Sequence, residues 1–255
     1  MQTPMSDLDL LIWQVELGAD EAMGDVPLNR FEEVQKTPAQ AVDPVVVPQT
    51  GTDDRGASAI AGAAATLEDL HRAIAAFEGC ALKQGARNTV FADGNPAAPL
   101  MIVGEAPGRD EDIQGKPFVG RSGALLDQIL TAIGLDRHAD AAEAAAYITN
   151  VLPWRPPQNR DPATDEMVML KAFLERHIAL AAPKVLITMG NAATKTLLET
   201  ETGITRMRGK WAEYRGIPVM PTFHPAALLR NPAQKREVWA DMLAVKAKLG
   251  EFARG

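Results

Sequence analysis

The stretch Gly104-Glu105-Ala106-Pro107-Gly108 follows the apolar run 99–103 and precedes three acidic residues at 110–112. A short apolar run that breaks into Gly-x-x-Pro-Gly predicts a buried strand whose end opens into a tight loop with exposed backbone. In an α/β sheet such loops lie at the carboxyl ends of the strands, where ligands bind. Three other loop segments have the same character, at 117–120, 149–150 and 224–225. We expect these four loops to converge on one pocket.

The rest of the chain alternates apolar runs of strand length with stretches of helical periodicity. Strands are expected at 99–103, 147–151, 184–188 and 218–222, with a further extended stretch at 89–91. Helices are expected at 66–83 (with Thr66 as its N-cap), 122–133, 164–181, 191–199 and 232–249. Strands that alternate with helices predict a parallel sheet with helices on both faces.

Composition divides the 255 residues into three segments. Residues 1–35 are acidic and include an amphipathic pattern at 5–24, which predicts an N-terminal helical segment. This helix either packs on the rest of the protein or binds a protein partner. Residues 36–63 are rich in Pro, Ala, Thr and Gly without a convincing period, which predicts a flexible linker. The folded domain is expected to span 64–255.

Charge is unevenly distributed along the chain. The net charge of −7 and the pI of about 5.2 argue at face value against a nucleic-acid partner. Residues 1–70, however, hold 13 acidic and 3 basic side chains, whereas the remaining 185 residues hold 20 acidic and 23 basic ones. Because the acid is concentrated at one end, the rest of the chain can still present a basic face.

The few cysteines and histidines and the short apolar runs argue against disulfide-bonded, metal-binding and membrane-spanning proteins. Cys80 is the one cysteine, so the chain can form no internal disulfide and no cysteine-based metal site of its own. The four histidines make no ligand pair of the HExxH kind. The apolar runs are too short to span a bilayer, and the early residues are acidic rather than basic, unlike a secretory signal. We therefore expect a cytoplasmic protein with no membrane partner.

Six blocks of the sequence together resemble a known family. They are GEAPGRDED (104–112), GKPFVGRSG (115–123), YITN (147–150), RPPQNR (155–160), RGKW (208–211) and HPAALLRNP (224–232). A lone Gly-x-x-Pro-Gly would be weak evidence, but six blocks in the same order with compatible spacing are specific. Over about residues 77–249 the chain resembles the uracil-DNA glycosylase superfamily, most closely its family 4. The resemblance implies a three-layer α/β/α fold with a central, mostly parallel four-stranded sheet.

The chain departs from family 4 at one set of positions. Family 4 enzymes hold an iron–sulfur cluster through four cysteines, and the corresponding residues here are Phe77, Cys80, Trp154 and Leu170. A cluster needs several thiolates, and this chain retains one. We therefore expect no iron–sulfur cluster and no other cofactor, with large apolar side chains filling the space and Cys80 as a buried core residue.

The resemblance implies roles for four side chains at the loop ends. Phe118 would stack on an everted base, although its spacing alone fits a core position equally well. The amide of Asn150 offers a donor and an acceptor that complement uracil O4 and N3–H, whereas a polar residue at a strand end is also a common turn former. His224 would stabilise the negative charge on uracil O2 as the glycosidic bond breaks. Glu105 matches the family 4 carboxylate, which could activate water, orient it or hold the edge of uracil.

Small residues in the first loop leave the basis of base selection open. Gly104, Ala106 and Gly108 are expected to line the base pocket. In the best-known branch of the superfamily, the water-positioning carboxylate stands at the place of Ala106. The tyrosine that excludes the methyl group of thymine stands there at the place of Gly108. The sequence therefore does not indicate how thymine would be rejected.

Basic and small loop residues are expected to contact DNA, since phosphate contacts dominate the affinity of such complexes. Arg121 and Ser122 stand at a helix N-terminus, which suits a phosphate. Arg208 and Lys210 belong to one basic loop, and residues 155–160 form another.

The leading interpretation is a monofunctional uracil-DNA glycosylase. Such an enzyme everts uracil from single- or double-stranded DNA, hydrolyses its N-glycosidic bond and leaves an abasic site. Leu228 resembles the apolar wedge that fills the gap left by the everted base. Two alternatives stay open: a glycosylase for hypoxanthine or xanthine, and a protein that binds uracil-containing DNA without cleaving it.

Overall fold

The computed structural model describes residues 54–253. The expected N-terminal segment 1–35 and most of the expected linker lie outside the described residues. Within the described range, six strands form one sheet in the order β1-β3-β2-β4-β6-β5. The strands are β1 (Ala92–Gly94), β2 (Leu100–Gly104), β3 (Tyr147–Asn150), β4 (Val185–Met189), β5 (Ala212–Tyr214) and β6 (Ile217–Thr222).

The four inner strands are the ones that the apolar runs predict, and they pair in parallel. The expectation of a four-stranded sheet is corrected by the two edge strands, β1 and β5, which pair antiparallel to β3 and β6. Each edge strand is three residues long and only partly buried. Neither edge strand therefore contains the run of apolar residues by which a buried strand is recognised in a sequence.

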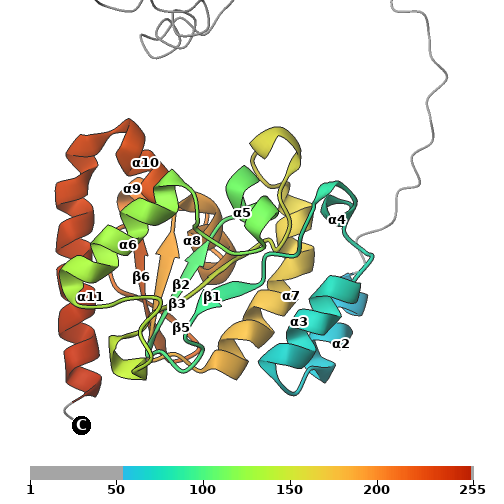
Figure 1. The fold of residues 1–255 in the computed structure, drawn as a ribbon, viewed down its shortest axis with the longest axis horizontal. Helices are drawn as coiled ribbons and strands as arrows, with labels where there is room; N and C mark the ends of the chain where they lie inside the picture. Colours follow the sequence, from blue (N-terminus) through green and yellow to red (C-terminus); the bar gives the residue numbers. More distant parts are fainter. Residues whose placement is uncertain (1–53, 254–255) are drawn as a thin grey trace, which may run out of the picture. The chain divides into compact units, whose positions relative to one another are not determined.

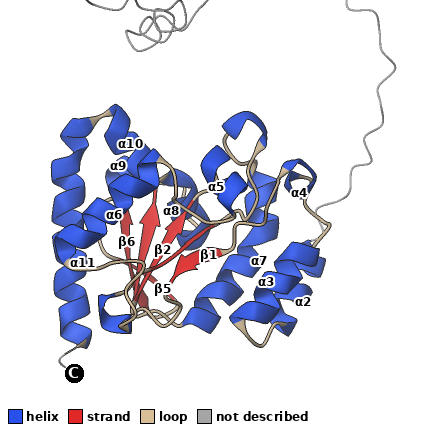
Figure 2. Ribbon diagram, viewed as in Figure 1, coloured by secondary structure: helices blue, strands red, loops and turns tan. Residues whose placement is uncertain are grey.

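Helices cover both faces of the sheet, as the alternation of elements predicts (Figures 1 and 2). Successive residues of β2 point to opposite sides: Met101 and Val103 join one buried cluster, whereas Leu100 and Ile102 join another. The first cluster includes residues of α2 (Asp54–Ala63), α3 (Leu67–Ala76), α7 (Thr164–Ala181) and α8 (Asn191–Leu198). The second includes residues of α6 (Arg121–Ile133), α9 (Ile204–Met207), α10 (Pro225–Arg230) and α11 (Lys235–Phe252).

Helix α2 corrects the prediction that the linker extends to residue 63. Its Ala57 and Ala61 are buried one turn apart, and such small side chains let the helix pack closely on α7. Arg176 of α7 also donates from Nε and Nη2 to the carbonyl oxygen of Ala64, at 2.9 and 2.6 Å. The alanine-rich composition that suggested a linker is equally that of a good helix former.

The first predicted helix ends earlier than expected. The capping box of Thr66 and Asp69 is present, with each side chain accepting from the other residue's backbone N–H at 3.1 Å. Helix α3 nevertheless stops at Ala76, and residues 82–85 form the separate short helix α4 (Leu82–Gly85). The remaining helical turns are α5 (Arg109–Gln114) and the 3₁₀ turns Ala142–Ala144, Pro157–Asn159 and Pro232–Gln234.

The register of the sheet brings the carboxyl ends of the inner strands level with one another. Gly104 of β2 lies opposite Asn150 of β3, and Met189 of β4 lies opposite Thr222 of β6. Backbone hydrogen bonds extend the β2–β3 pairing into the loops, since Leu152 N–H donates to the carbonyl oxygen of Glu105 at 3.0 Å. The loops that follow these strands therefore share one edge of the sheet. No helix in the described range is long and apolar enough to cross a membrane.

Candidate active site

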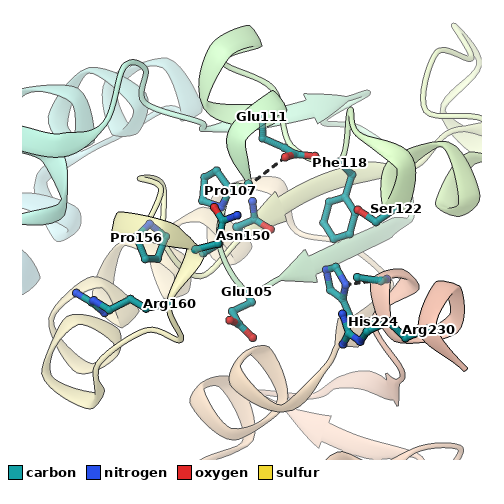
Figure 3. Close-up of a pocket in the computed structure, with 14 residues that line it drawn as sticks. Glu105, Pro107, Glu111, Phe118, Ser122, Asn150, Pro156, Arg160, His224 and Arg230 are labelled. Carbon is teal, nitrogen blue, oxygen red and sulfur yellow. Dashed lines mark hydrogen bonds between the residues drawn. The ribbon is translucent and has the colours of Figure 1, made fainter. Parts of the chain in front are cut away.

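A cavity of about 330 Å³ opens at this edge of the sheet (Figure 3). Its lining comes from the loops after β2, β3 and β6, from the loop before α6, and from residues of α5, α6 and α10. The lining residues are Glu105, Ala106, Pro107, Gly108, Glu111, Phe118, Ser122, Asn150, Pro156, Asn159, Arg160, His224, Ala226 and Arg230. The four side chains predicted at the loop ends, Glu105, Phe118, Asn150 and His224, are all among them.

Gly104 ends β2 beneath this cavity rather than in its lining. A Cβ atom at this position would lie 2.3 Å from Oδ1 of Asn150 and 2.6 Å from the ring of Phe118. Both distances are far shorter than a normal contact, so any larger residue would push these two side chains apart. The absence of a side chain at Gly104 thus allows the amide and the ring to meet over the strand end.

Phe118 has an unusual backbone conformation for a residue with a side chain. Its φ angle is 54°, in the left-handed region that non-glycine residues rarely adopt. The side chain is buried, and its ring lies 5.2 Å from the ring of His224 at an interplanar angle of 28°. A strained residue of this kind persists only where the surrounding structure holds it, and such residues concentrate at functional sites.

Glu111 fastens the two loops that form the upper wall of the cavity. It is buried, and its carboxylate accepts the backbone N–H groups of Gly108 at 3.1 Å and of Val119 and Gly120 at 3.0 Å. A carboxylate with three backbone donors is well compensated for its burial. The loop after β2 and the loop that carries Phe118 are therefore held by one side chain.

His224 is the N-cap of α10, and its ring is fixed by the helix that it starts. Its Nδ1 accepts the backbone N–H of Ala226 at 3.2 Å, so in the neutral ring the proton is on Nε2. Removal from water lowers the pKa of His224 to about 4, and the positive charge of Arg230 adds to this decrease. At neutral pH the ring is therefore uncharged, with Nε2–H free to donate.

Glu105 lies on the opposite side of the cavity from Phe118 (Figure 3). Burial raises the pKa of its carboxyl group, and the negative charge of Asp161 raises it further. A carboxylate with a raised pKa is a stronger base than one in water. The side chain can therefore accept a proton or orient a water molecule more effectively than an exposed glutamate could.

A second cavity of about 710 Å³ shares Glu105, His224 and Arg230 with the first. Its other walls come from the start of α8, including Lys195, and from the loop before α7. The two cavities therefore adjoin one another along the same edge of the sheet. Arg230 is exposed, takes part in none of the ion pairs found among the described residues, and faces both cavities.

Only some of the residues predicted to contact DNA line a cavity. Ser122 lines the first cavity, whereas Arg121 and Lys210 are exposed and line neither cavity. Arg208 also lines neither cavity, and its guanidinium group forms an ion pair with the buried Asp241 and donates to the carbonyl oxygen of Glu237 at 2.9 Å. These donors tie the loop after α9 to α11, and a contact between Arg208 and DNA stays a prediction.

The prediction of Leu228 as an exposed wedge is also corrected. Its side chain is 1% exposed and belongs to the cluster between the sheet, α6 and α11. The neighbouring Leu229 is the exposed leucine of α10, with 40% of its surface accessible. A run of two leucines does not reveal from sequence which of them faces the core.

Several lining residues were not among the predicted site residues. Glu111 and Arg230 lie within the quoted sequence blocks, but nothing in their spacing indicates three backbone acceptor contacts or a position between two cavities. Arg160 comes from the basic loop 155–160 and is held at the rim by Glu166, with Nη1 2.9 Å from Oε2. Figure 3 shows Arg160 and Arg230 on opposite sides of the cavity.

The positions that correspond to the family 4 cluster ligands do not fit such a cluster. Phe77, Cys80, Trp154 and Leu170 are all at most 5% exposed and belong to one buried apolar cluster. The ring of Phe77 packs edge-on against Phe173 at 5.2 Å, and burial raises the pKa of the single thiol. One thiol among two aromatic side chains and a leucine cannot replace four thiolates.

The cavity lies at the carboxyl end of β2, where the strand order reverses between β3 and β4, and its lining includes a fixed imidazole and a carboxylate. In α/β sheets this is the place where small-molecule ligands bind. Residues 91–243 match the model of the uracil DNA glycosylase superfamily, and the chain belongs to this superfamily. The type-4 uracil-DNA glycosylase of Sulfurisphaera tokodaii is 38% identical over 190 residues, which cover 71% of this chain and 84% of the relative. The enzyme of the same name from Archaeoglobus fulgidus is 38% identical over 195 residues, 73% of this chain and 93% of the relative.

Proposed function

We propose that the protein is a uracil-DNA glycosylase that removes uracil from single- or double-stranded DNA and leaves an abasic site. The observation that carries this proposal is the convergence of Glu105, Phe118, Asn150 and His224, from four separate loops, on one cavity. The similarity to type-4 uracil-DNA glycosylases over most of the chain supports the same substrate. The base must leave the helix to reach the cavity, at a cost of about a few kcal/mol.

Two side chains would recognise the everted base. The ring of Phe118 offers a stacking surface, and such stacking is worth about 1–3 kcal/mol per base. Asn150 is buried at the end of β3, and its amide can accept from N3–H while it donates to O4. A buried amide that loses its partner is penalised, so a base without this donor and acceptor pair would bind less well.

His224 would stabilise the leaving group. As the bond between C1′ and N1 breaks, its electron pair passes to uracil and the charge spreads to O2. The neutral ring can donate Nε2–H to this oxygen, and the contact with Ala226 holds the ring in place beforehand. Preorganised donors of this kind are worth about 10²–10³ in rate each.

Glu105 would act on the water molecule that completes hydrolysis. The oxygen of water bonds to C1′, and the proton that it loses passes to the carboxylate or to solvent through it. The raised pKa of Glu105 suits this task. Arg160, Arg230 and Ser122 surround the opening and would contact the phosphates that flank the everted nucleotide.

Release of free uracil from a labelled oligonucleotide tests the proposal directly. The purified protein is mixed with single- and double-stranded substrates that carry one uracil, and abasic sites are cleaved with alkali and resolved on a gel. We expect excision from uracil substrates and no excision from thymine controls, with equal rates in the presence of a metal chelator. Matched substrates with hypoxanthine or xanthine test the alternative base.

Two results would contradict the proposal. Excision of hypoxanthine or xanthine without excision of uracil would change the substrate. Tight, salt-sensitive binding of the uracil oligonucleotide without any release of base would identify a binding protein instead of an enzyme.

A further inference from the structure

Arg137 is a buried cation in the loop after α6, outside the six blocks that carry the family resemblance. Its side chain is 3% exposed, although arginine is rarely buried without a specific set of partners. Nε donates to Asp127 at 2.7 Å, and Nη1 lies 3.3 Å from a carboxylate oxygen of Asp93. Nη1 also donates to the backbone carbonyl oxygen of Pro117 at 3.0 Å.

The carbonyl group of Pro117 belongs to the peptide bond that enters Phe118. On the other side of Phe118, the N–H groups of Val119 and Gly120 donate to the buried carboxylate of Glu111. The strained residue is therefore held from both sides, by a buried cation before it and a buried anion after it. A third restraint is Gly123, where a Cβ atom would lie 1.8 Å from the carbonyl oxygen of Phe118.

We propose that Arg137 is a positioning residue that holds Phe118 in its left-handed conformation, so that the ring faces the base in the cavity. This inference rests on the proposed function, because it assigns a consequence for excision to a residue outside the cavity. Arg137 contacts no part of the cavity lining except through the loop that carries Phe118. Its effect on the reaction must therefore pass through that ring.

The two carboxylates that pair with Arg137 do not depend on it alone for compensation of their charge. Asp93 in β1 also pairs with Lys116, at 3.2 Å, so residues 116 and 117 are both tied to the edge strand. Asp127 is 46% exposed and remains hydrated without its partner. Replacement of Arg137 by glutamine therefore leaves no buried carboxylate without a cation or water, and the variant is expected to fold.

A double-mutant cycle with Phe118 separates positioning from general stabilisation. Single-turnover excision of uracil is measured for the wild type, Arg137→Gln, Phe118→Ala and the double variant. We expect Arg137→Gln alone to lower the rate by about ten-fold or more, the scale of a lost stacking contact. In the Phe118→Ala background the same substitution should change the rate by less than about two-fold.

Arg176 supplies the matched control. It also donates from a guanidinium group to a backbone carbonyl oxygen, that of Ala64, but between α7 and α2 on the far side of the sheet from α6. Arg176→Gln should therefore leave the excision rate unchanged even if it lowers the unfolding midpoint in urea. Equal losses of rate in the Arg137→Gln and Arg176→Gln variants would overturn the inference.

A second readout does not depend on turnover. Because the ring of Phe118 lies 5.2 Å from that of His224, its ring current shifts the NMR signals of His224, and the chain has only four histidines to assign. In Arg137→Gln the His224 signal should move towards its position in Phe118→Ala. An unmoved signal, or additive losses in the cycle, would overturn the role of Arg137 while wild-type excision still supports the proposed function. A wild type that excises no uracil would overturn the proposed function itself.

Discussion

Two regions of the molecule differ in how well their residues match the family 4 pattern. They are the cavity at the carboxyl edge of the sheet and the apolar cluster around Trp154. In the cavity, Glu105, Phe118, Asn150 and His224 all stand where the resemblance to family 4 places functional residues. In the cluster, three of the four positions that would carry cysteines hold Phe77, Trp154 and Leu170 instead, and all three are buried.

The difference reflects two kinds of physical requirement. A reaction needs particular donors, acceptors and charges at fixed places, so a change of residue type removes the function even when the volume is kept. An iron–sulfur cluster with a structural role fills space and links segments of the chain. Apolar side chains of suitable size can do the same by packing. Trp154 also keeps a polar tie, since its Nε1 donates to Oγ1 of Thr89 at 3.1 Å.

The largest expected effect comes from removal of the two polar groups of the cavity. We expect the His224→Ala, Asn150→Ala double variant to lose at least about 10⁴ in single-turnover rate, because each preorganised contact is worth about 10²–10³. Because His224→Ala also removes the N-cap of α10, at a cost of about 0.5–2 kcal/mol, the rate is compared per folded molecule, with the folded fraction taken from urea unfolding. An excision rate within ten-fold of the wild type would refute the site assignment.

The second prediction concerns the apolar cluster, where a substitution should lower stability and leave the excision rate unchanged. Trp154→Ala should lower the free energy of unfolding by about 3–5 kcal/mol, because it removes a 1% exposed indole from the core. The excision rate per folded molecule should stay near that of the wild type. Trp239→Ala is the control, since this tryptophan is 44% exposed and should change stability by less than about 0.5 kcal/mol. Urea unfolding followed by circular dichroism measures both.

The third prediction is the pH dependence of excision. Because the pKa of His224 is about 4 rather than 6.5, the ring is neutral throughout the range from pH 8 to 6. Titration of His224 should therefore cause no break in the rate near pH 6.5, whereas protonation of the Glu105 carboxylate should lower the rate on the acid side. The folded state binds fewer protons at His224 than the unfolded state between pH 6.5 and 4, so this residue makes folding less favourable as the pH falls through that window. A rate that rises as the pH falls from 7 to 6 would contradict a neutral donor, because it would show that the protonated ring assists the reaction.

The smallest expected effect distinguishes the rim of the cavity from the opposite edge of the sheet. If Arg230 contacts a phosphate, Arg230→Gln should reduce the slope of log binding constant against log salt concentration by about 1. Lys184 precedes β4 at the amino end of the strands, the edge opposite the cavity, and Lys184→Gln should leave the slope unchanged. Equal slopes for the wild type and Arg230→Gln would remove Arg230 from the DNA-contacting surface.

Strands, helices and caps that depend on neighbouring residues could be predicted from the sequence. The four inner strands, the helices at 122–133, 164–181 and 191–199 and the capping box at Thr66 follow from periodicity and turn residues, which operate over a few positions. The convergence of the loops after β2, β3 and β6 also followed, since parallel strands put their carboxyl ends on one edge. The loop that carries Phe118 lies between α5 and α6, so this rule does not place it.

Residues whose partners are distant in the chain could not be predicted in this way. The burial of Leu228, the pairing of Arg208 with Asp241 and the contact of Arg137 with Pro117 each depend on which elements pack together. The sequence by itself determined the elements and the chemical groups available at their ends, because both are set by local residue types. Only the tertiary structure decided which of those groups face the cavity and which are neutralised in the core, because burial and charge pairing are properties of the packed fold.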